Sequence, residues 1–142
     1  MQNVKAFIAG FLSTLIFHQG IIALLHAVDP NVPAPFSMAP TGPLNVPMVI
    51  STAFWGGVWG VVLWAIIRNF RGAKHWGGAV ILGALLPSLV LWFVVMPLKG
   101  MGVAGGGNPK IIVGALFVNA IWGIGVALIM RGLNRVPVLS AR

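Results

Sequence analysis

The sequence contains no cysteine and almost no acidic residue. Among its 142 residues, Asp29 is the only carboxylate. The missing cysteines exclude disulfides, thiolate metal sites and a cysteine nucleophile. Paired carboxylates, a Ser–His–Asp triad and a Mg²⁺ site all need acids that the chain does not have. We therefore expect that the chain alone is not an enzyme, and that Asp29, which precedes a proline, only initiates a turn.

Charged residues of either sign are scarce, at 7% of the chain, whereas hydrophobic residues make up 58%. A soluble domain averages about 25% charged residues, so this chain could not cover a water-facing surface. A helix crosses a bilayer with about 20 apolar residues. Four segments without Asp, Glu, Lys or Arg are this long: 6–28, 46–67, 76–98 and 111–130. The sequence predicts an all-α membrane protein whose single domain, residues 1–142, is a four-transmembrane-helix bundle.

The first of these segments could be taken for a secretory signal peptide, because Lys5 precedes its apolar run. The run of about 23 residues is longer than the 7–15 of a signal peptide, and no convincing A-x-A cleavage site follows it. We interpret it as a retained helix.

The basic residues lie mostly on one side of the predicted bundle. Seven of the nine flank the spans on that side: Lys5, Arg68, Arg71, Lys74, Arg131, Arg135 and Arg142. Lys99 and Lys110 lie on the other side. The positive-inside rule then places both termini and the 68–75 link in the cytoplasm, as in a bacterial inner membrane. The net charge of +8 is interpreted as attraction to anionic lipid headgroups, not to nucleic acid.

The two outer loops, 29–45 and 99–110, differ in composition. The first contains five prolines and is expected to be an extended, stiff cap. The second contains five glycines and is expected to be pliable. Because the link 69–75 is short, the second and third spans are expected to be antiparallel neighbours.

The second and fourth spans share residues at a constant offset. Five identities are 63 positions apart: Phe54, Trp59, Gly60, Ile66 and Arg68 match Phe117, Trp122, Gly123, Ile129 and Arg131. The first and third spans match only weakly. A hairpin of two helices returns the chain to the same side. A duplication would therefore give two tandem helical hairpins in parallel orientation, not inverted repeats.

Small residues in the same two spans indicate close helix packing. Gly56 and Gly60 form a G-x-x-x-G motif with Gly57 between them, and Gly123 and Gly125 mark the equivalent region of the fourth span. Such residues let helix backbones approach in lipid. They favour packing within the bundle, the alternative being a dimer interface.

Four residues form a candidate polar site near the middle of the predicted bilayer: His18, Pro87, Ser88 and Asn119. Polar groups at that depth are costly and often mark a binding site or pathway. One hypothesis is that His18 and Asn119 converge beside the proline. The alternative is purely structural, with His18 donating a hydrogen bond to Asn119 or to a carbonyl freed by Pro87.

A haem with two histidine ligands does not fit the sequence. His18 and His26 share the first span, and His75 lies at the opposite edge of the bundle from His26. We expect no cofactor and no metal, with haem or pigment ligation by His18 alone as the alternative.

These observations favour a non-catalytic accessory or assembly subunit that packs against other membrane proteins. One alternative is a small homo-oligomeric channel or carrier for ions or small solutes, because parallel repeats suit a pseudo-symmetric pore. A weaker alternative is lipid, quinone or pigment binding between the helices. The expected partners are the bilayer and either other membrane subunits or further copies of this chain.

Overall fold

The computed structural model describes residues 1–135, which are helical apart from the loops. The first long helix runs over α1 (Gln2–Ser13), η1 (Thr14–His18) and α2 (Gln19–Val28), and the second is α3 (Met48–Ile67). The third runs over α4 (Gly72–Val90), η2 (Leu91–Val95) and α5 (Met96–Leu98), and the fourth is α7 (Pro109–Arg135). Within these residues, the four helices are long and apolar enough to cross a membrane. The predicted all-helical class is confirmed.

The helices differ from the predicted spans only near their ends. Three of them extend beyond the apolar run by a few residues, and the last continues to Arg135. The second starts later than predicted, at Met48, because Val46 and Pro47 belong to a β-strand. Hydropathy detects the apolar run, whereas the helix continues into polar residues until its hydrogen bonding ends.

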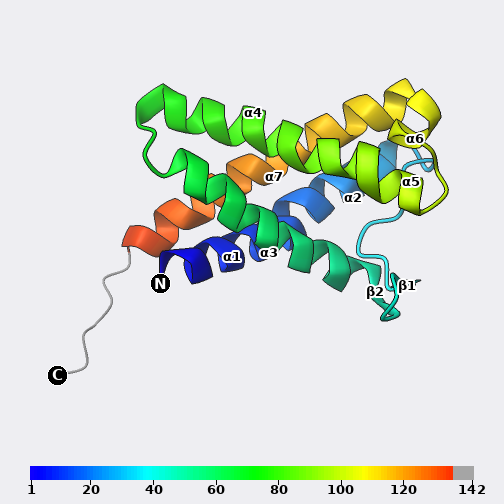
Figure 1. The fold of residues 1–142 in the computed structure, drawn as a ribbon, viewed down its shortest axis with the longest axis horizontal. Helices are drawn as coiled ribbons and strands as arrows, with labels where there is room; N and C mark the ends of the chain where they lie inside the picture. The colour runs from blue at the N-terminus through cyan, green and yellow to red at the C-terminus, as the bar shows by residue number, and fades with distance from the viewer. Residues whose placement is uncertain (136–142) are drawn as a thin grey trace.

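The helices pack as two hairpins joined through α1 and α7. The most extensive contacts are between α4 and α7 and between α1 and α3, followed by α1 with α7. The short link between α3 and α4 led us to expect antiparallel neighbours. The two helices run in opposite directions from the link, but they contact each other much less than they contact α1 and α7. These two helices meet at the link and then diverge toward the other end of the bundle (Figure 1). Each finds its main partner elsewhere, which leaves space between them.

The two hairpins close through the same kind of glycine contact. In the first, a Cβ atom on Gly60 would lie 2.6 Å from the Ala6 carbonyl oxygen and 2.8 Å from the Cα of Gly10. In the second, a Cβ atom on Gly83 would lie 2.8 Å from the Cα of Gly123. Real Cβ atoms do not approach this closely, so each backbone crossing requires glycine.

The first helix of each hairpin carries the same short motif: Ala6-x-x-x-Gly10 in α1 and Ala79-x-x-x-Gly83 in α4. Just as Gly60 faces the Ala6 carbonyl, Gly123 faces that of Ala79. The two motifs are 73 positions apart, whereas Gly60 and Gly123 are 63 apart. The first hairpin is therefore ten residues longer between its contacts, and an ungapped alignment misses the match.

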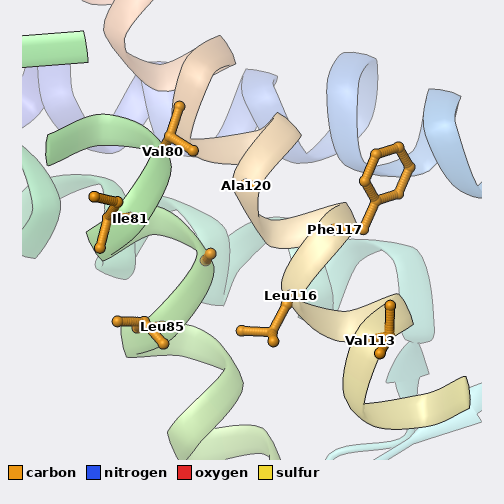
Figure 2. Close-up of a pocket in the computed structure, with 8 residues that line it drawn as sticks. Val80, Ile81, Leu85, Val113, Leu116, Phe117 and Ala120 are labelled. Atoms are coloured by element: carbon orange, nitrogen blue, oxygen red, sulfur yellow. The ribbon is translucent and has the colours of Figure 1, made fainter. Parts of the chain in front are cut away.

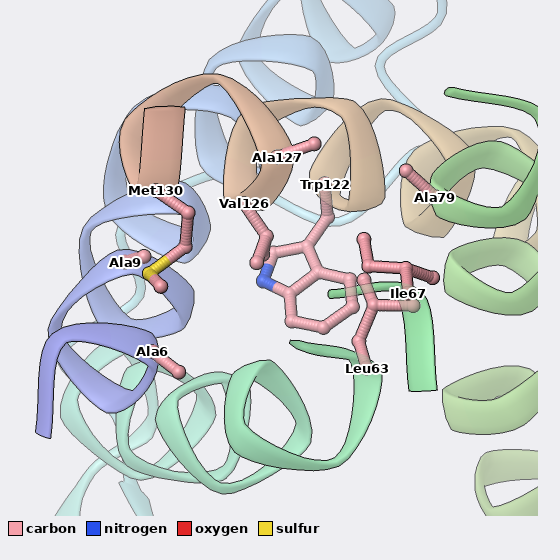
Figure 3. Close-up of a cluster of buried hydrophobic side chains, with 9 residues drawn as sticks. All are labelled: Ala6, Ala9, Leu63, Ile67, Ala79, Trp122, Val126, Ala127 and Met130. Carbon is pink, nitrogen blue, oxygen red and sulfur yellow. The ribbon is translucent and has the colours of Figure 1, made fainter. Parts of the chain in front are cut away.

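A hydrophobic cluster fills the bundle near the 68–71 link (Figure 3). It comprises Ala6, Ala9, Leu63, Ile67, Ala79, Trp122, Val126, Ala127 and Met130. Two hydrogen bonds join α1 to α7 beside it: Trp122 Nε1 donates to the Gly10 carbonyl at 3.2 Å, and Ser13 Oγ donates to the Trp122 carbonyl at 2.7 Å. This half of the bundle is closed.

Both ends of the described chain lie at this same end of the bundle (Figure 1). Lys5 Nζ donates to the Leu133 carbonyl at 2.9 Å, and Gln2 Nε2 donates to Asn134 Oδ1 at 3.3 Å. The start of α1, the link between α3 and α4 and the end of α7 meet here, at what we call the basic end (Figure 1). These segments and the turns next to them contain six basic residues: Lys5, Arg68, Arg71, Lys74, Arg131 and Arg135. Arg142 lies outside the described residues.

The long proline-rich loop lies at the opposite end, which we call the loop end. It is not helical, as expected, but it closes with a short antiparallel hairpin of β1 (Pro40–Thr41) and β2 (Val46–Pro47). Gln19 reaches from α2 to hold it, since its Oε1 accepts a hydrogen bond of 2.7 Å from the Phe36 backbone N–H.

The glycine-rich loop, predicted to be pliable, contains a short turn, α6 (Ala104–Gly107). All four residues have a positive φ, between 50° and 77°. This is a single left-handed turn, which costs non-glycine residues about 1–2 kcal/mol each. The glycine run is therefore a requirement of this backbone conformation.

Candidate functional site

The divergence of α3 and α4 opens a cavity of about 880 Å³ between them, which we call the α3–α4 cavity. Its walls come from η1, α3, α4, η2 and α7. A volume of this size is typical of ligand pockets, about 300–1,000 Å³. The space is only partly enclosed, since its lining residues Trp55 and Val94 are 57% and 47% exposed. Most of the surface that lines it is apolar.

The β-hairpin and the end of α5 form the mouth of the cavity, at the loop end. Thr41, Gly42 and Pro43 line it on one side and Lys99 on the other. Lys99 Nζ donates to Thr41 Oγ1 at 3.5 Å across the opening. The proline-rich loop thus covers part of this mouth.

The inner end of the cavity carries the polar groups that the sequence singled out. His18, Asn119 and Pro87 all line it, together with Thr14 and Trp122. His18 and Asn119 thus border the same space from different helices. Trp122 also belongs to the hydrophobic cluster, so the cavity ends where the closed half of the bundle begins.

Ser88, the fourth predicted residue, lies behind the cavity wall and is fully buried. Its Oγ accepts a hydrogen bond of 2.9 Å from Asn119 Nδ2. This bond between α4 and α7 orients the amide of Asn119 and leaves its carbonyl oxygen without a partner among residues 1–135. Ser88 is thus a support for Asn119.

His18 has no hydrogen-bond partner in the part of the chain that the structure describes. Its Nδ1 is enclosed by protein and unpartnered. The purely structural alternative required a bond from His18 to Asn119 or to a carbonyl near Pro87, and the described residues provide neither. A buried polar atom without a partner is uncommon in native structures and calls for an explanation.

Trp92 has the other enclosed and unpartnered side-chain atom, Nε1. It packs with Met96 and Ala104 in a second hydrophobic cluster at the loop end. Trp92 does not line the cavity, so it offers a ligand no contact there.

Both π-helical segments border the cavity. Thr14 and His18 come from η1, and Leu91, Val94 and Val95 come from η2. A π segment inserts one extra residue into an α-helix and turns the following side chains to a new face, and such segments are frequent at functional sites. No pattern in the sequence predicted either segment.

Several further residues that line the cavity were not predicted as site residues. Ser51, Thr52, Trp55 and Trp59 line the cavity from one face of α3. They follow helical spacing, but which face of α3 borders the space depends on how the helix packs. Only the divergence of α3 and α4 identifies it.

The five glycines predicted to pack helices all lie against another helix of the same chain. Gly56 and Gly60 face α1, and a Cβ atom on Gly57 would lie 2.6 Å from Phe7 Cε2. Gly123 faces α4, and Gly125 lies against Ser13 and Phe17. These contacts occupy the glycine faces within one chain, leaving none of them free as a dimer interface.

The other two described histidines lie away from His18 and are engaged locally. His26 Nδ1 is 2.6 Å from the Val32 carbonyl oxygen, and His75 Nδ1 is 3.0 Å from that of Ile67. Within residues 1–135, no three potential metal ligands cluster.

Asp29 initiates a turn, as predicted. Its carboxylate accepts hydrogen bonds from the backbone N–H of Asn31 at 3.0 Å and from the Asn31 side chain at 2.8 Å. These bonds favour the ionised form, so they lower the pKa of Asp29. Asp29 does not line the cavity.

A second hollow, of about 460 Å³, lies between α4 and α7 on the side of the bundle (Figure 2). Its lining consists of Val80, Ile81, Ala84, Leu85, Val113, Leu116, Phe117 and Ala120. It is an open, apolar depression without a polar side chain to orient a ligand. The α3–α4 cavity is therefore the candidate site.

None of the protein families, curated proteins or solved structures with which the chain was compared matches it.

Proposed function

We propose that this chain is an integral membrane protein that binds a lipid-soluble small molecule in the α3–α4 cavity, without catalysing a reaction on it. The observation that carries this proposal is the cavity itself, about 880 Å³ of mostly apolar space with His18 and Asn119 at its inner end. Ligand sites combine this kind of apolar wall with a few polar groups that fix orientation.

Insertion into a membrane is supported by the surface of the helices. Many large apolar side chains along the helices are exposed. Ile16, Leu24, Ile81 and Phe93 are each more than half exposed. Such a surface would be unstable in water and is suited to lipid. We place the basic end in the cytoplasm of a bacterial cell, because cytoplasmic loops are rich in Lys and Arg.

A channel through a single chain is less well supported than binding. The hydrophobic cluster around Trp122, Leu63 and Met130 fills the bundle between the cavity and the basic end. An ion entering at the loop end would meet this apolar barrier. A carrier that opens alternately to each side remains compatible with the cavity, since it too must bind its cargo.

The role of accessory subunit, which the sequence alone favours, now ranks second. Packing against other membrane proteins needs an exposed apolar surface, and the hollow of Figure 2 is one. It does not need a cavity between helices with an unpartnered histidine. Mild-detergent purification separates the two roles, because an obligate subunit would be recovered with a partner chain.

We also infer that the fold arose as two tandem helical hairpins in parallel orientation. The support is the matched pair of contacts, Gly60 on Ala6 and Gly10 and Gly123 on Ala79 and Gly83. The hairpins differ in one respect. Helices α1 and α7 pack closely, whereas α3 and α4 diverge and leave the cavity.

The proposed function is tested by placing a larger side chain on the wall of the cavity. Val58 lines it from α3, whereas Ile50 on the same helix does not line it and is 46% exposed. We expect purified wild-type protein and Ile50→Phe to retain a lipid-soluble compound in organic extracts analysed by mass spectrometry. Val58→Phe should retain at least tenfold less. The proposal would be refuted if both variants retained the compound equally, or if none of the three proteins retained a specific compound.

A further inference from the structure

We propose that the ligand of the α3–α4 cavity is a neutral molecule with a flat conjugated ring bearing carbonyl oxygens, a quinone-type headgroup, attached to a hydrocarbon tail. The ring would lie at the inner end beside His18 and Asn119, and the tail would follow the apolar walls toward α5. This inference rests on the proposed function and specifies its ligand. It concerns binding only and includes no electron transfer.

The first argument is the hydrogen-bonding capacity left at the inner end. A neutral imidazole carries one N–H. An enclosed nitrogen without a partner is better tolerated as an acceptor than as a donor, so the proton of His18 belongs on Nε2, because Nδ1 is the enclosed atom. Since His18 lines the cavity, Nε2–H is available to donate to a ligand oxygen.

Two neighbouring hydroxyls are already used as donors, since Thr14 Oγ1 donates to the Gly10 carbonyl at 3.0 Å and Thr52 Oγ1 donates to the Met48 carbonyl at 2.8 Å. Asn119 has two amide N–H groups, of which one donates to Ser88 and the other remains. The imidazole N–H and this second amide N–H are therefore the donors that His18 and Asn119 offer a ligand oxygen. A carbonyl oxygen, which accepts and has no proton of its own, is their natural partner.

The second argument is charge. Of the described residues that line the cavity, Lys99 alone is charged, and it lies at the mouth, next to Thr41. A carboxylate or phosphate placed beside His18 would have no cation near it in an apolar environment, and a cationic ligand would find no acid. Burying an unpaired charge is costly. The inner end therefore suits an uncharged headgroup.

The third argument is shape. Three indole rings line the cavity, those of Trp55, Trp59 and Trp122. Flat aromatic side chains pack well against a flat conjugated ring in stacked or edge-to-face geometry. The β-branched walls that lead toward α5, Val90, Val94 and Val95, offer no such match and suit a flexible hydrocarbon chain.

The test is a binding titration of the full-length protein in lipid nanodiscs. The probe is a benzoquinone carrying a decyl chain, with decylbenzene and decanoate as matched compounds that keep the tail and change the head. The change in tryptophan fluorescence reports binding, because three tryptophans line the site. We expect saturable quinone binding, at least tenfold tighter than that of either comparison compound.

Variants locate the headgroup. His18→Phe and Asn119→Leu should each weaken quinone binding at least tenfold. His26→Phe, the same change outside the cavity, should leave it unchanged. If His18→Phe fails to fold, the comparison of the three compounds on the wild type still decides. One result would overturn this inference and leave the proposed function intact: decanoate binds more tightly than the quinone, and Lys99→Ala weakens the binding of decanoate.

Saturable binding of decylbenzene as tight as that of the quinone would also overturn the headgroup assignment, because only the tail would matter. If no compound binds saturably and the wild type and Val58→Phe behave alike, the inference and the proposed function fail together. The four patterns of outcome are therefore distinguishable.

Discussion

At the scale of single residues, glycine controls how closely the helices approach. Gly10 is the clearest case, since a Cβ atom there would overlap the Gly56 carbonyl oxygen and lie 2.9 Å from the Cα of Gly60. Both neighbours are backbone atoms, which cannot move aside as a flexible side chain can. In lipid, where helix association depends on packing, the loss of such contacts has no hydrophobic compensation.

We expect Gly10→Ala to destabilise the protein by about 1–3 kcal/mol, the usual cost of overpacking a close contact. Gly20→Ala is the matched control, because nothing lies within 4 Å of a Cβ atom at Gly20. That change should be neutral, or stabilising by up to about 1 kcal/mol through helix propensity. Thermal unfolding in detergent measures both. A Gly10→Ala protein as stable as Gly20→Ala would contradict the packing account.

At the scale of elements, the two π segments and the proline-rich loop shape the site. η1 brings Thr14 and His18 to the cavity wall, and η2 contributes the facing apolar side chains. A regular α-helix would turn each following residue by about 100° relative to its present direction. The π geometry therefore determines what faces the cavity.

Inserting an alanine after Ile16 tests the role of η1. Ile16 is 59% exposed and does not line the cavity. Because η1 already holds one extra residue, a second one should turn His18 by about 100°, away from the cavity. We expect circular dichroism to show unchanged helix content, with at least a tenfold loss of the retained compound. Retention at the wild-type level would show that the direction of His18 is not needed for binding.

The loop over the mouth depends on Gln19, which is 7% exposed. Gln19→Leu removes the acceptor of the Phe36 N–H, a bond worth about 0.5–1.5 kcal/mol. We expect proteolytic cleavage between residues 29 and 47 to accelerate several-fold. Gln2→Leu makes the same change at the basic end and should leave the cleavage rate as it is. Equal rates in the two variants would mean that other contacts hold the loop.

At the scale of the whole molecule, the charge distribution and the even number of long helices define two unlike ends. Six described basic residues lie at the basic end, whereas Lys99 and Lys110 lie at the loop end. This asymmetry predicts the orientation of the protein in a membrane. It also places the mouth of the α3–α4 cavity on the outer side.

Because the chain has no cysteine, single cysteines can report this orientation without background. Ala34→Cys lies exposed in the proline-rich loop, and Ala73→Cys lies exposed near the link between α3 and α4. In intact cells whose outer membrane is permeabilised, a membrane-impermeant maleimide should label Ala34→Cys and spare Ala73→Cys. Inverted membrane vesicles should give the opposite pattern. The reverse result in both preparations would invert the proposed topology.

Much of the fold could be predicted, because apolar runs are local in sequence. The four long helices and the location of His18, Pro87 and Asn119 near one depth required only composition and counting. The match between α1 and α4 was missed because the first hairpin is ten residues longer between its glycine contacts. The left-handed turn in the glycine-rich loop was not predicted, because composition does not distinguish such a turn from other loop conformations.

The sequence by itself determined the helical class, the two unlike ends and the lack of acidic catalytic groups, since these depend on which residues are present and in what order. Only the tertiary structure decided that α3 and α4 separate, that His18 and Asn119 border one cavity, and that Nδ1 of His18 is left without a partner. These features depend on the rotation of each helix and on which neighbour it selects. Both follow from contacts between residues far apart in the sequence, which no local pattern encodes. Gly10 and Gly60 are 50 positions apart, and Ser13 and Trp122 are 109 positions apart.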